Sequence, residues 1–218
     1  METIVLNGWA ASESAWELCR FPRARVFGYL EELDGLPERH ILASDGCVLV
    51  GWSMGGSFAL SMAARHPEKV KGLVLLAATP RMMRDDGWAG MSPRRLAALE
   101  TGLTLTRGEG FFGLPEGWPR VYRMDTPENL HRGIEYLEKT DLRADLEKLA
   151  ASGRFNADVA VFHSEKDGIV RPENAAYLKK IFPAARVEIV PGAEHALPVV
   201  IHEKIDAAVG NICYNIRL

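Results

Sequence analysis

Residues 48–60 read VLVGWSMGGSFAL, and this stretch constrains the fold more than any other part of the chain. An apolar run ends at Gly51, Ser53 follows two residues later, and Gly55 precedes a helix-like apolar pattern. Where a strand turns abruptly into a helix, the corner residue is strained and its neighbours approach so closely that a Cβ would clash. The G-x-S-x-G spacing therefore predicts a strand, a sharp turn with Ser53 at its corner, and a helix.

Short apolar runs alternate with segments of helical length along most of the chain. Most of the runs are continuously apolar, as in strands that helices cover on both faces. Strands separated by helices form right-handed crossover units and a parallel sheet. We expect an α/β fold with a mostly parallel sheet of about six strands and helices on both faces. The expected strands are 3–6, 25–29, 48–51, 73–77, 159–163 and 187–190.

Residues 81–139 break this rhythm, because they carry helical patterns but no convincing strand. Ser92-Pro93 and Thr126-Pro127 each read as a helix N-cap followed by proline at the first helical position. This predicts a helical cap over residues 81–139, inserted into a core formed by residues 1–80 and 140–218. A long structureless loop is the alternative.

The composition is that of a globular chain, with 218 residues, 47% of them hydrophobic, and a formal net charge of -3. This charge gives no reason to expect a nucleic-acid or membrane partner. The chain has no apolar run long enough to span a bilayer, and its first residues lack the basic start of a secretory signal. Three scattered cysteines without CxxC spacing fit a reducing cytoplasm. We therefore expect a cytoplasmic protein without a metal site.

A nucleophilic serine needs a base, and the base needs an acid that orients it. On this fold the expected chain order is serine, acid, histidine. Only His195 lies in a loop directly after the final predicted strand, so it is the expected base. The other histidines do not lie in this loop; they are His40, His66, His131, His163 and His202.

The acid should follow the preceding strand, which runs into the segment SEKDG at residues 164–168. Asp167 stands at the turn and is the expected acid, with Asp141 and Glu165 as rivals. Asp141 follows a helical segment, and Glu165 stands early in the loop. An oxyanion hole also needs two backbone N–H groups. Met54, directly after the serine, and Trp9, in the loop after the first strand, are the expected donors.

Together these features resemble the α/β-hydrolase superfamily. The segments LVGWSMGG, LVLLAATPRM, DGWAGMSPRRLAALETGL, GIEYLEKTDLRADL and HSEKDGIVRP are most similar to the carboxylesterases that act on pimeloyl-acyl-carrier-protein methyl ester in biotin synthesis. The resemblance runs from Leu6 to about Pro198 and implies an ester substrate that is either a small molecule or linked to a carrier protein, with no cofactor. The residues that it implies are the triad Ser53, Asp167 and His195, the oxyanion donors Trp9 and Met54, and the substrate-binding residues Trp9, Phe111 and Phe112.

This chain departs from the family in three places. Asn7 stands where the family usually has a histidine, the first residues lie close to the oxyanion strand, and the cap segment is shorter. The cap contains arginines but no lysine between residues 81 and 132, and Arg94 and Arg95 are the first candidates for contact with an acidic carrier protein. A solvated helical face with internal ion pairs is the alternative. A thioesterase, a carbon–carbon bond hydrolase, a cofactor-free lyase and a non-catalytic ligand-binding relative remain alternatives on the same scaffold.

Overall fold

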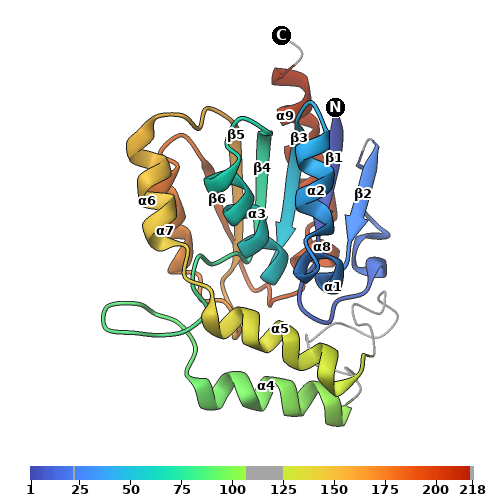
Figure 1. Ribbon diagram of the computed structural model, residues 1–218, viewed down its shortest axis with the longest axis vertical. Coiled ribbons are helices and arrows are strands. Elements are labelled where there is room, and N and C mark those ends of the chain that lie inside the picture. The colour runs from blue at the N-terminus through green and yellow to red at the C-terminus, as the bar shows by residue number, and fades with distance from the viewer. Residues whose placement is uncertain (22, 107–124, 217–218) are drawn as a thin grey trace.

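Six parallel strands form the centre of the fold in a computed structural model, which describes residues 1–21, 23–106 and 125–216 (Figure 1). Their order across the sheet is β2-β1-β3-β4-β5-β6, and every neighbouring pair is parallel. This confirms the expected α/β class and the number of strands. The strands are β1 (Glu2–Leu6), β2 (Ala24–Phe27), β3 (Cys47–Trp52), β4 (Val70–Leu76), β5 (Asp158–Ser164) and β6 (Arg186–Val190).

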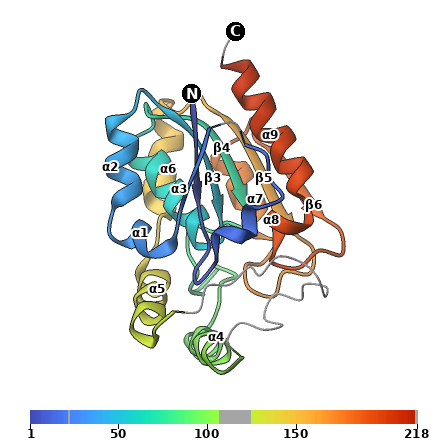
Figure 2. The same cartoon turned by 90° about the vertical axis from the view of Figure 1, so that its right-hand side faces the viewer.

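Helices cover both faces of this sheet (Figures 1 and 2). Apolar residues of α2, α3, α6 and α7 pack on one face, and those of α8 and α9 pack on the other. The described helices are the 3-10 helix η1 (Glu13–Trp16) and α1 (Tyr29–Leu33), α2 (Leu36–Ala43), α3 (Met54–Arg65), α4 (Pro93–Thr106), α5 (Pro127–Lys139), α6 (Arg143–Ser152), α7 (Asn174–Ile181), α8 (Leu197–Val200) and α9 (His202–Asn215).

Strand β3 shows why the central runs are continuously apolar. Its residues are all buried, and they alternate between the two faces of the sheet. Val48 and Val50 belong to the core that includes Val209 of α9, whereas Leu49 belongs to the core that includes Leu60 of α3. Because both faces need apolar side chains, a period of two is not visible in the sequence of this strand.

Several strand boundaries differ from the sequence-based expectations, and the largest shift is at β4, which begins at Val70 rather than at residue 73. The second strand ends at Phe27, because the backbone N–H of Gly28 binds the Glu31 carboxylate at 2.9 Å and helix α1 begins at Tyr29. After β6 the chain forms two helices, α8 and α9, which are divided at Ile201 because its backbone is not helical. Helix α7 begins at Asn174, two residues after Pro172.

Helices α4 and α5, which we call the cap helices, lie beyond the carboxyl ends of the strands (Figures 1 and 2). They pack against each other, and α5 also packs against α1. The chain leaves the core and returns to it side by side, since Arg81 forms an antiparallel bridge with Asp141 and the Leu142 N–H donates to the Pro80 carbonyl at 2.9 Å. Among the described helices, none has the length and apolar character that crossing a membrane requires.

Candidate active site

Ser53 occupies the turn between β3 and α3 in a strained conformation, with φ 57° and ψ -118°. Its N–H donates to the carbonyl of Leu76 at 2.9 Å, which ties the turn to the end of β4. The turn is so tight that a Cβ added at Gly51 would lie 2.6 Å from the carbonyl oxygen of Gly55. Both glycines of the sequence motif are therefore required by packing, as we expected from their spacing.

Three predicted residues from different loops form one chain of hydrogen bonds. His195 Nε2 lies 2.9 Å from Ser53 Oγ, and His195 Nδ1 lies 2.8 Å from Asp167 Oδ2. The three residues follow β3, β6 and β5, so that the parallel sheet brings them to one edge. All three are buried, with 8% or less of each residue exposed. In this arrangement the imidazole can accept the serine proton while the carboxylate fixes the ring and stabilises its charged form.

The Asp167 carboxylate is fully occupied by hydrogen bonds. Its second oxygen, Oδ1, accepts the N–H groups of Ile169 at 2.8 Å and Val170 at 2.9 Å. Burial acts to raise the pKa of this carboxyl, but the neighbouring His195 and the two N–H groups outweigh burial, and the pKa is lowered. Asp167 therefore stays ionised beside the imidazole at neutral pH.

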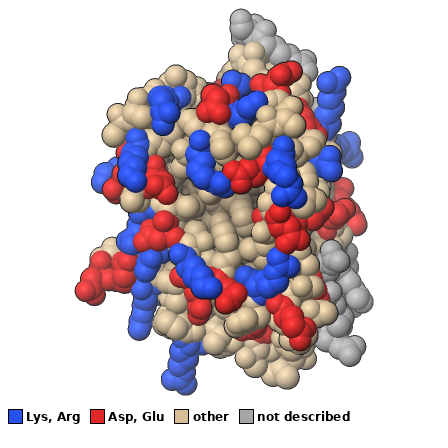
Figure 3. Space-filling model, viewed as in Figure 1, with Lys and Arg blue, Asp and Glu red and all other residues tan. Residues whose placement is uncertain are grey.

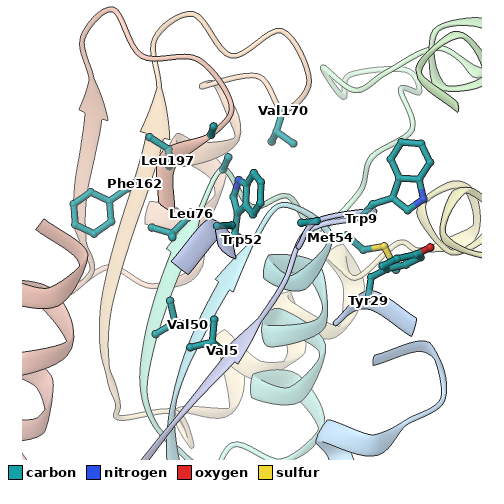
Figure 4. Close-up of a cluster of buried hydrophobic side chains, with 14 of the residues drawn as sticks. Val5, Trp9, Tyr29, Val50, Trp52, Met54, Leu76, Phe162, Val170 and Leu197 are labelled. Atoms are coloured by element: carbon teal, nitrogen blue, oxygen red, sulfur yellow. The ribbon is translucent and has the colours of Figure 1, made fainter. Parts of the chain in front are cut away.

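Trp52 holds the His195 loop, a role that the sequence did not indicate. Its indole N–H donates to the carbonyl of His195 at 2.9 Å, and the two rings lie 5.6 Å apart between centroids. Trp52 directly precedes Ser53, so the same short segment positions both the hydroxyl and the histidine. In Figure 4 the Trp52 side chain stands near the centre of the buried cluster, among the strand ends.

The two rival acids make structural contacts elsewhere. Asp141 forms ion pairs with Arg81 at 2.8 Å and with Arg143 at 2.7 Å, at the junction between core and cap helices. Glu165 accepts the N–H of Gly192 at 2.7 Å and so joins the loop after β5 to the loop after β6. Neither carboxylate makes a hydrogen bond to a histidine in the described part of the chain.

The loop after β1 passes directly beside Ser53. A Cβ added at Gly8 would lie 3.5 Å from the Cβ of Ser53 and 3.2 Å from the Trp52 ring. The next residue, Trp9, and Met54 at the start of α3 are the predicted oxyanion donors. Within residues 1–21, 23–106 and 125–216, neither backbone N–H donates a hydrogen bond, and so both remain available to a ligand.

Asn7 fixes this loop from within. Its side chain accepts the N–H of Gly8 at 3.0 Å and the indole N–H of Trp16 at 3.1 Å, and donates to the carbonyl of Ser12 at 3.0 Å. An amide supplies both donors and acceptors, so Asn7 can make all three contacts at once. Trp16, a buried residue of the core, therefore also makes a polar contact with the loop.

A buried carboxyl lies behind the loop and was not singled out in the sequence. Glu32 Oε1 accepts the backbone N–H of Asn7 at 2.6 Å, and only 3% of Glu32 is exposed. Desolvation raises the pKa of Glu32 well above its ordinary value, although the Asn7 hydrogen bond opposes this shift. A glutamate in a short helix reads as a surface residue, so no signal in a single sequence indicates its burial.

A cavity of about 20 Å³ lies beside the serine and the histidine, about the space of one water molecule. Apart from Ser53 and His195, its lining is apolar and includes Trp9 and residues of both cap helices. Phe111 and Phe112, the other predicted substrate-binding residues, lie outside the described residues. The lining residues are Trp9, Ser53, Met82, Leu96, Leu99, Leu137, Ile169 and His195.

The side chain of Arg95 in α4 contacts the loop after β5, which contains Asp167. Its Nη2 atom donates to the carbonyl of Gly168 at 2.5 Å, next to Asp167. The neighbouring Arg94 is exposed, and no hydrogen bond or ion pair of its side chain occurs among the described residues. Of the two arginines expected to contact a carrier protein, Arg95 therefore already has a partner within the chain.

Within the described residues, no group of three or more His, Cys, Asp or Glu side chains is placed to hold a metal ion. The chemistry available at this edge of the sheet is that of a hydroxyl, an imidazole, a carboxylate and free backbone N–H groups. Such a set is suited to attack on a carbonyl carbon and stabilisation of the resulting oxyanion.

The profile of the alpha/beta hydrolase fold family matches residues 38–200, and the chain belongs to this family. Curated relatives include the pimeloyl-[acyl-carrier protein] methyl ester esterase of Nitrosospira multiformis, which is 27% identical over 235 residues covering 89% of this chain and 87% of the relative.

Solved structures of the same fold cover nearly the whole chain. An esterase from Exiguobacterium antarcticum superposes with a TM-score of 0.75 at 19% identity and covers 100% of this chain and 92% of its own. A bromoperoxidase from Bacillus anthracis gives a TM-score of 0.73 at 20% identity, with 98% and 91% of the two chains covered. At these identities the likeness concerns the fold alone.

Proposed function

We propose that the protein is a serine carboxylesterase. The observation that carries this proposal is the continuous hydrogen-bonded chain from the Ser53 hydroxyl through His195 to the Asp167 carboxylate. A solvated serine at an ordinary strand–helix turn needs neither a buried imidazole at hydrogen-bonding distance nor a carboxylate behind that imidazole. A non-catalytic ligand-binding relative has no use for these three matched residues.

In the proposed reaction, Ser53 Oγ attacks the ester carbonyl carbon while His195 Nε2 takes its proton. The backbone N–H groups of Trp9 and Met54 donate to the oxyanion of the tetrahedral intermediate. His195 then returns the proton to the departing alcohol, and an acyl group remains on Ser53. Water, deprotonated by the same imidazole, then attacks the acyl carbon, the bond to Ser53 Oγ breaks as His195 returns the proton to this oxygen, and the carboxylic acid is released. Asp167 stays ionised and stabilises the imidazolium in both half-reactions.

The proposed substrate is pimeloyl-[acyl-carrier protein] methyl ester, after the names of the curated relatives. The apolar residues around Ser53 and His195 suit the methylene chain of an acyl group close to the reacting carbonyl. The division into a core of residues 1–80 and 140–218 and a cap of residues 81–139 belongs to this proposal, with the cap covering the acyl chain.

Active-site labelling tests the nucleophile. A fluorophosphonate probe is expected to label the wild-type protein at one residue, because it phosphonylates an activated serine. Ser53→Ala should remove the labelling while leaving the circular dichroism spectrum and melting temperature close to those of the wild type. Labelling that persists in a folded Ser53→Ala protein would show that Ser53 is not the nucleophile.

A substrate panel tests the reaction class. We expect methyl esters of dicarboxylic acyl groups, free or linked to acyl-carrier protein, to be hydrolysed faster than the matching thioesters. Preferential turnover of thioesters would identify a thioesterase, and turnover of carbon–carbon bonded diketones alone would identify a carbon–carbon bond hydrolase. Hydrolysis in every arm is compared with Ser53→Ala, which reports the background rate.

A further inference from the structure

The side chain of Trp9 is anchored outside the sheet, on cap helix α5. Its indole Nε1–H donates to the carbonyl of Leu130 at 3.0 Å, across 121 positions of the chain. Figure 4 shows the Trp9 ring at the side of the buried cluster, away from the strand residues Val5 and Val50. The backbone N–H of the same residue is one of the two proposed oxyanion donors. The backbone of Trp9 therefore lies beside Ser53, whereas its indole ring contacts cap helix α5.

Gly133 makes this contact possible. It lies three residues after Leu130, one turn along the same side of α5. A Cβ added at Gly133 would lie 2.2 Å from Trp9 Cδ1 and 2.6 Å from Trp9 Nε1, and all three nearest atoms belong to Trp9. Glycine inside a helix is less favourable than alanine. At this position it allows the indole to lie directly against the helix backbone.

Helix α5 is itself fixed to the core near the nucleophile. Tyr136 of α5 stacks on Phe58 of α3, with ring centroids 4.3 Å apart and planes 8° apart. Arg132 of α5 pairs with Asp34, which follows α1, at 2.6 Å. Because α3 begins immediately after Ser53, the nucleophile and the support of the oxyanion loop belong to one connected frame.

We infer that α5 positions the oxyanion loop, and that Gly133 and the Leu130 carbonyl are positioning groups for the Trp9 backbone N–H. This inference rests on the proposed function, because it concerns the stabilisation of the same tetrahedral intermediate. An oxyanion donor acts mainly in the transition state, so a displaced loop lowers kcat and leaves KM nearly unchanged. The cap therefore contributes to the rate of the reaction as well as to the choice of substrate.

Trp9→Phe tests the indole contact, because it removes the N–H and retains an aromatic ring and the backbone donor. With a p-nitrophenyl ester, we expect kcat to fall about tenfold and KM to change by less than about twofold. The fall in kcat is smaller than that on complete removal of an oxyanion donor, because the backbone N–H is displaced rather than lost. The affinity for a trifluoromethyl ketone, which forms a tetrahedral adduct with serine, should fall by the same factor as kcat/KM. A purely structural role of Trp9 would lower the melting temperature without this parallel loss.

Gly133→Ala tests the helix side of the contact, with Gly210→Ala as the matched control. A Cβ at Gly210, in helix α9, meets no atom within 4 Å. We expect Gly133→Ala to lower kcat about tenfold and Gly210→Ala to leave it unchanged. In a Trp9→Ala background the added methyl group has no ring to displace, so Gly133→Ala should then change kcat by less than about twofold.

The outcomes separate this inference from the proposed function. Wild-type kcat in folded Trp9→Phe and Gly133→Ala proteins would overturn the positioning role and leave the esterase assignment intact. Equal losses from Gly133→Ala with and without Trp9 would also overturn it, because the effect would not pass through the indole. Absence of esterase activity in the wild type, or its persistence in Ser53→Ala, would instead contradict the proposed function. If Trp9→Ala does not fold, the kcat of Trp9→Phe and its affinity for the trifluoromethyl ketone still test the positioning role.

Discussion

Asp167 and Asp141 are both held by several hydrogen bonds, but only Asp167 contacts the imidazole. In Asp167→Asn, the amide oxygen is expected to keep the N–H groups of Ile169 and Val170, because both donate to Oδ1. The amide NH₂ then faces His195 Nδ1 and forces the proton onto Nε2, the atom that must accept the serine proton. We expect kcat to fall by about two to four orders of magnitude.

Asp141→Asn is the matched control for this prediction. It should retain near wild-type kcat on a p-nitrophenyl ester and lose at most about 1 kcal/mol of stability, since its ion pairs are partly exposed. Both variants are compared by steady-state turnover and by thermal melting. A large loss of kcat in Asp141→Asn with full activity in Asp167→Asn would mean that the acid has been assigned to the wrong loop.

Glu32 predicts a pH dependence of stability rather than of chemistry. Desolvation raises its pKa in the folded state, so the folded protein retains a proton that the unfolded chain loses above about pH 4.3. Between the unfolded and folded pKa values, stability therefore falls as the pH rises, by about 1.4 kcal/mol per pH unit for this one group.

Glu32→Gln removes this ionisation and keeps the carbonyl acceptor for the Asn7 N–H. We expect the melting temperature of the variant, relative to the wild type, to increase as the pH rises above the unfolded pKa of Glu32 and to level off above the folded pKa. Thermal melts at matched ionic strength measure this difference. Two melting curves that shift in parallel with pH would show that Glu32 is ionised in the folded state.

At the scale of elements, the sequence predicted the strands and helices whose hydrophobic pattern and end signals lie within the element itself. The strand 48–51 is a continuous apolar run followed by a glycine motif, and the helix at 127–139 has proline at its start and Leu130, Ile134 and Leu137 on one face. All three of these side chains are buried. The order of strand, acid loop and histidine loop also follows from the parallel topology, since carboxyl ends of parallel strands share one edge.

Other contacts could not be predicted because their partners are distant in the sequence. Arg95 resembles a surface arginine until α4 is placed beside the carbonyl of Gly168, 73 positions away. Gly133 did carry a signal, since glycine is unfavourable within a helix and therefore suggests close packing. The sequence alone does not identify Trp9 as the residue that packs there. Tertiary packing, rather than local preference, decides these roles.

At the scale of the whole molecule, the face shown in Figure 3 carries interspersed charges of both signs rather than a field of one sign. Most described arginines of the cap segment have partners, such as Arg132 with Asp34. Arg84 and Arg94 are exposed, and no side-chain hydrogen bond or ion pair of either occurs in the described ranges. These two residues replace the adjacent pair 94 and 95 as the first candidates for contact with an acidic carrier protein.

Arg84→Glu/Arg94→Glu should weaken turnover of a carrier-linked pimeloyl methyl ester, most strongly at low salt, because ions screen attraction between exposed charges. Turnover of a p-nitrophenyl ester should be unchanged. Lys180→Glu/Arg186→Glu makes the same change in charge on α7 and at the start of β6, at the opposite edge of the sheet, and should affect neither substrate. Equal losses on both substrates would indicate damage to the cap, and no loss on either would argue against a carrier partner.

Pro80 and Leu142 lie side by side, so the segment between them begins and ends at the same place. A segment with this arrangement can be exchanged for another without moving the strands. The contact of Trp9 with Gly133 restricts that freedom. On the positioning role that we infer for α5, a replacement segment must bring a carbonyl and a glycine to the same place to keep the reaction rate. We therefore expect a change of this segment that alters the range of substrates to alter the reaction rate as well.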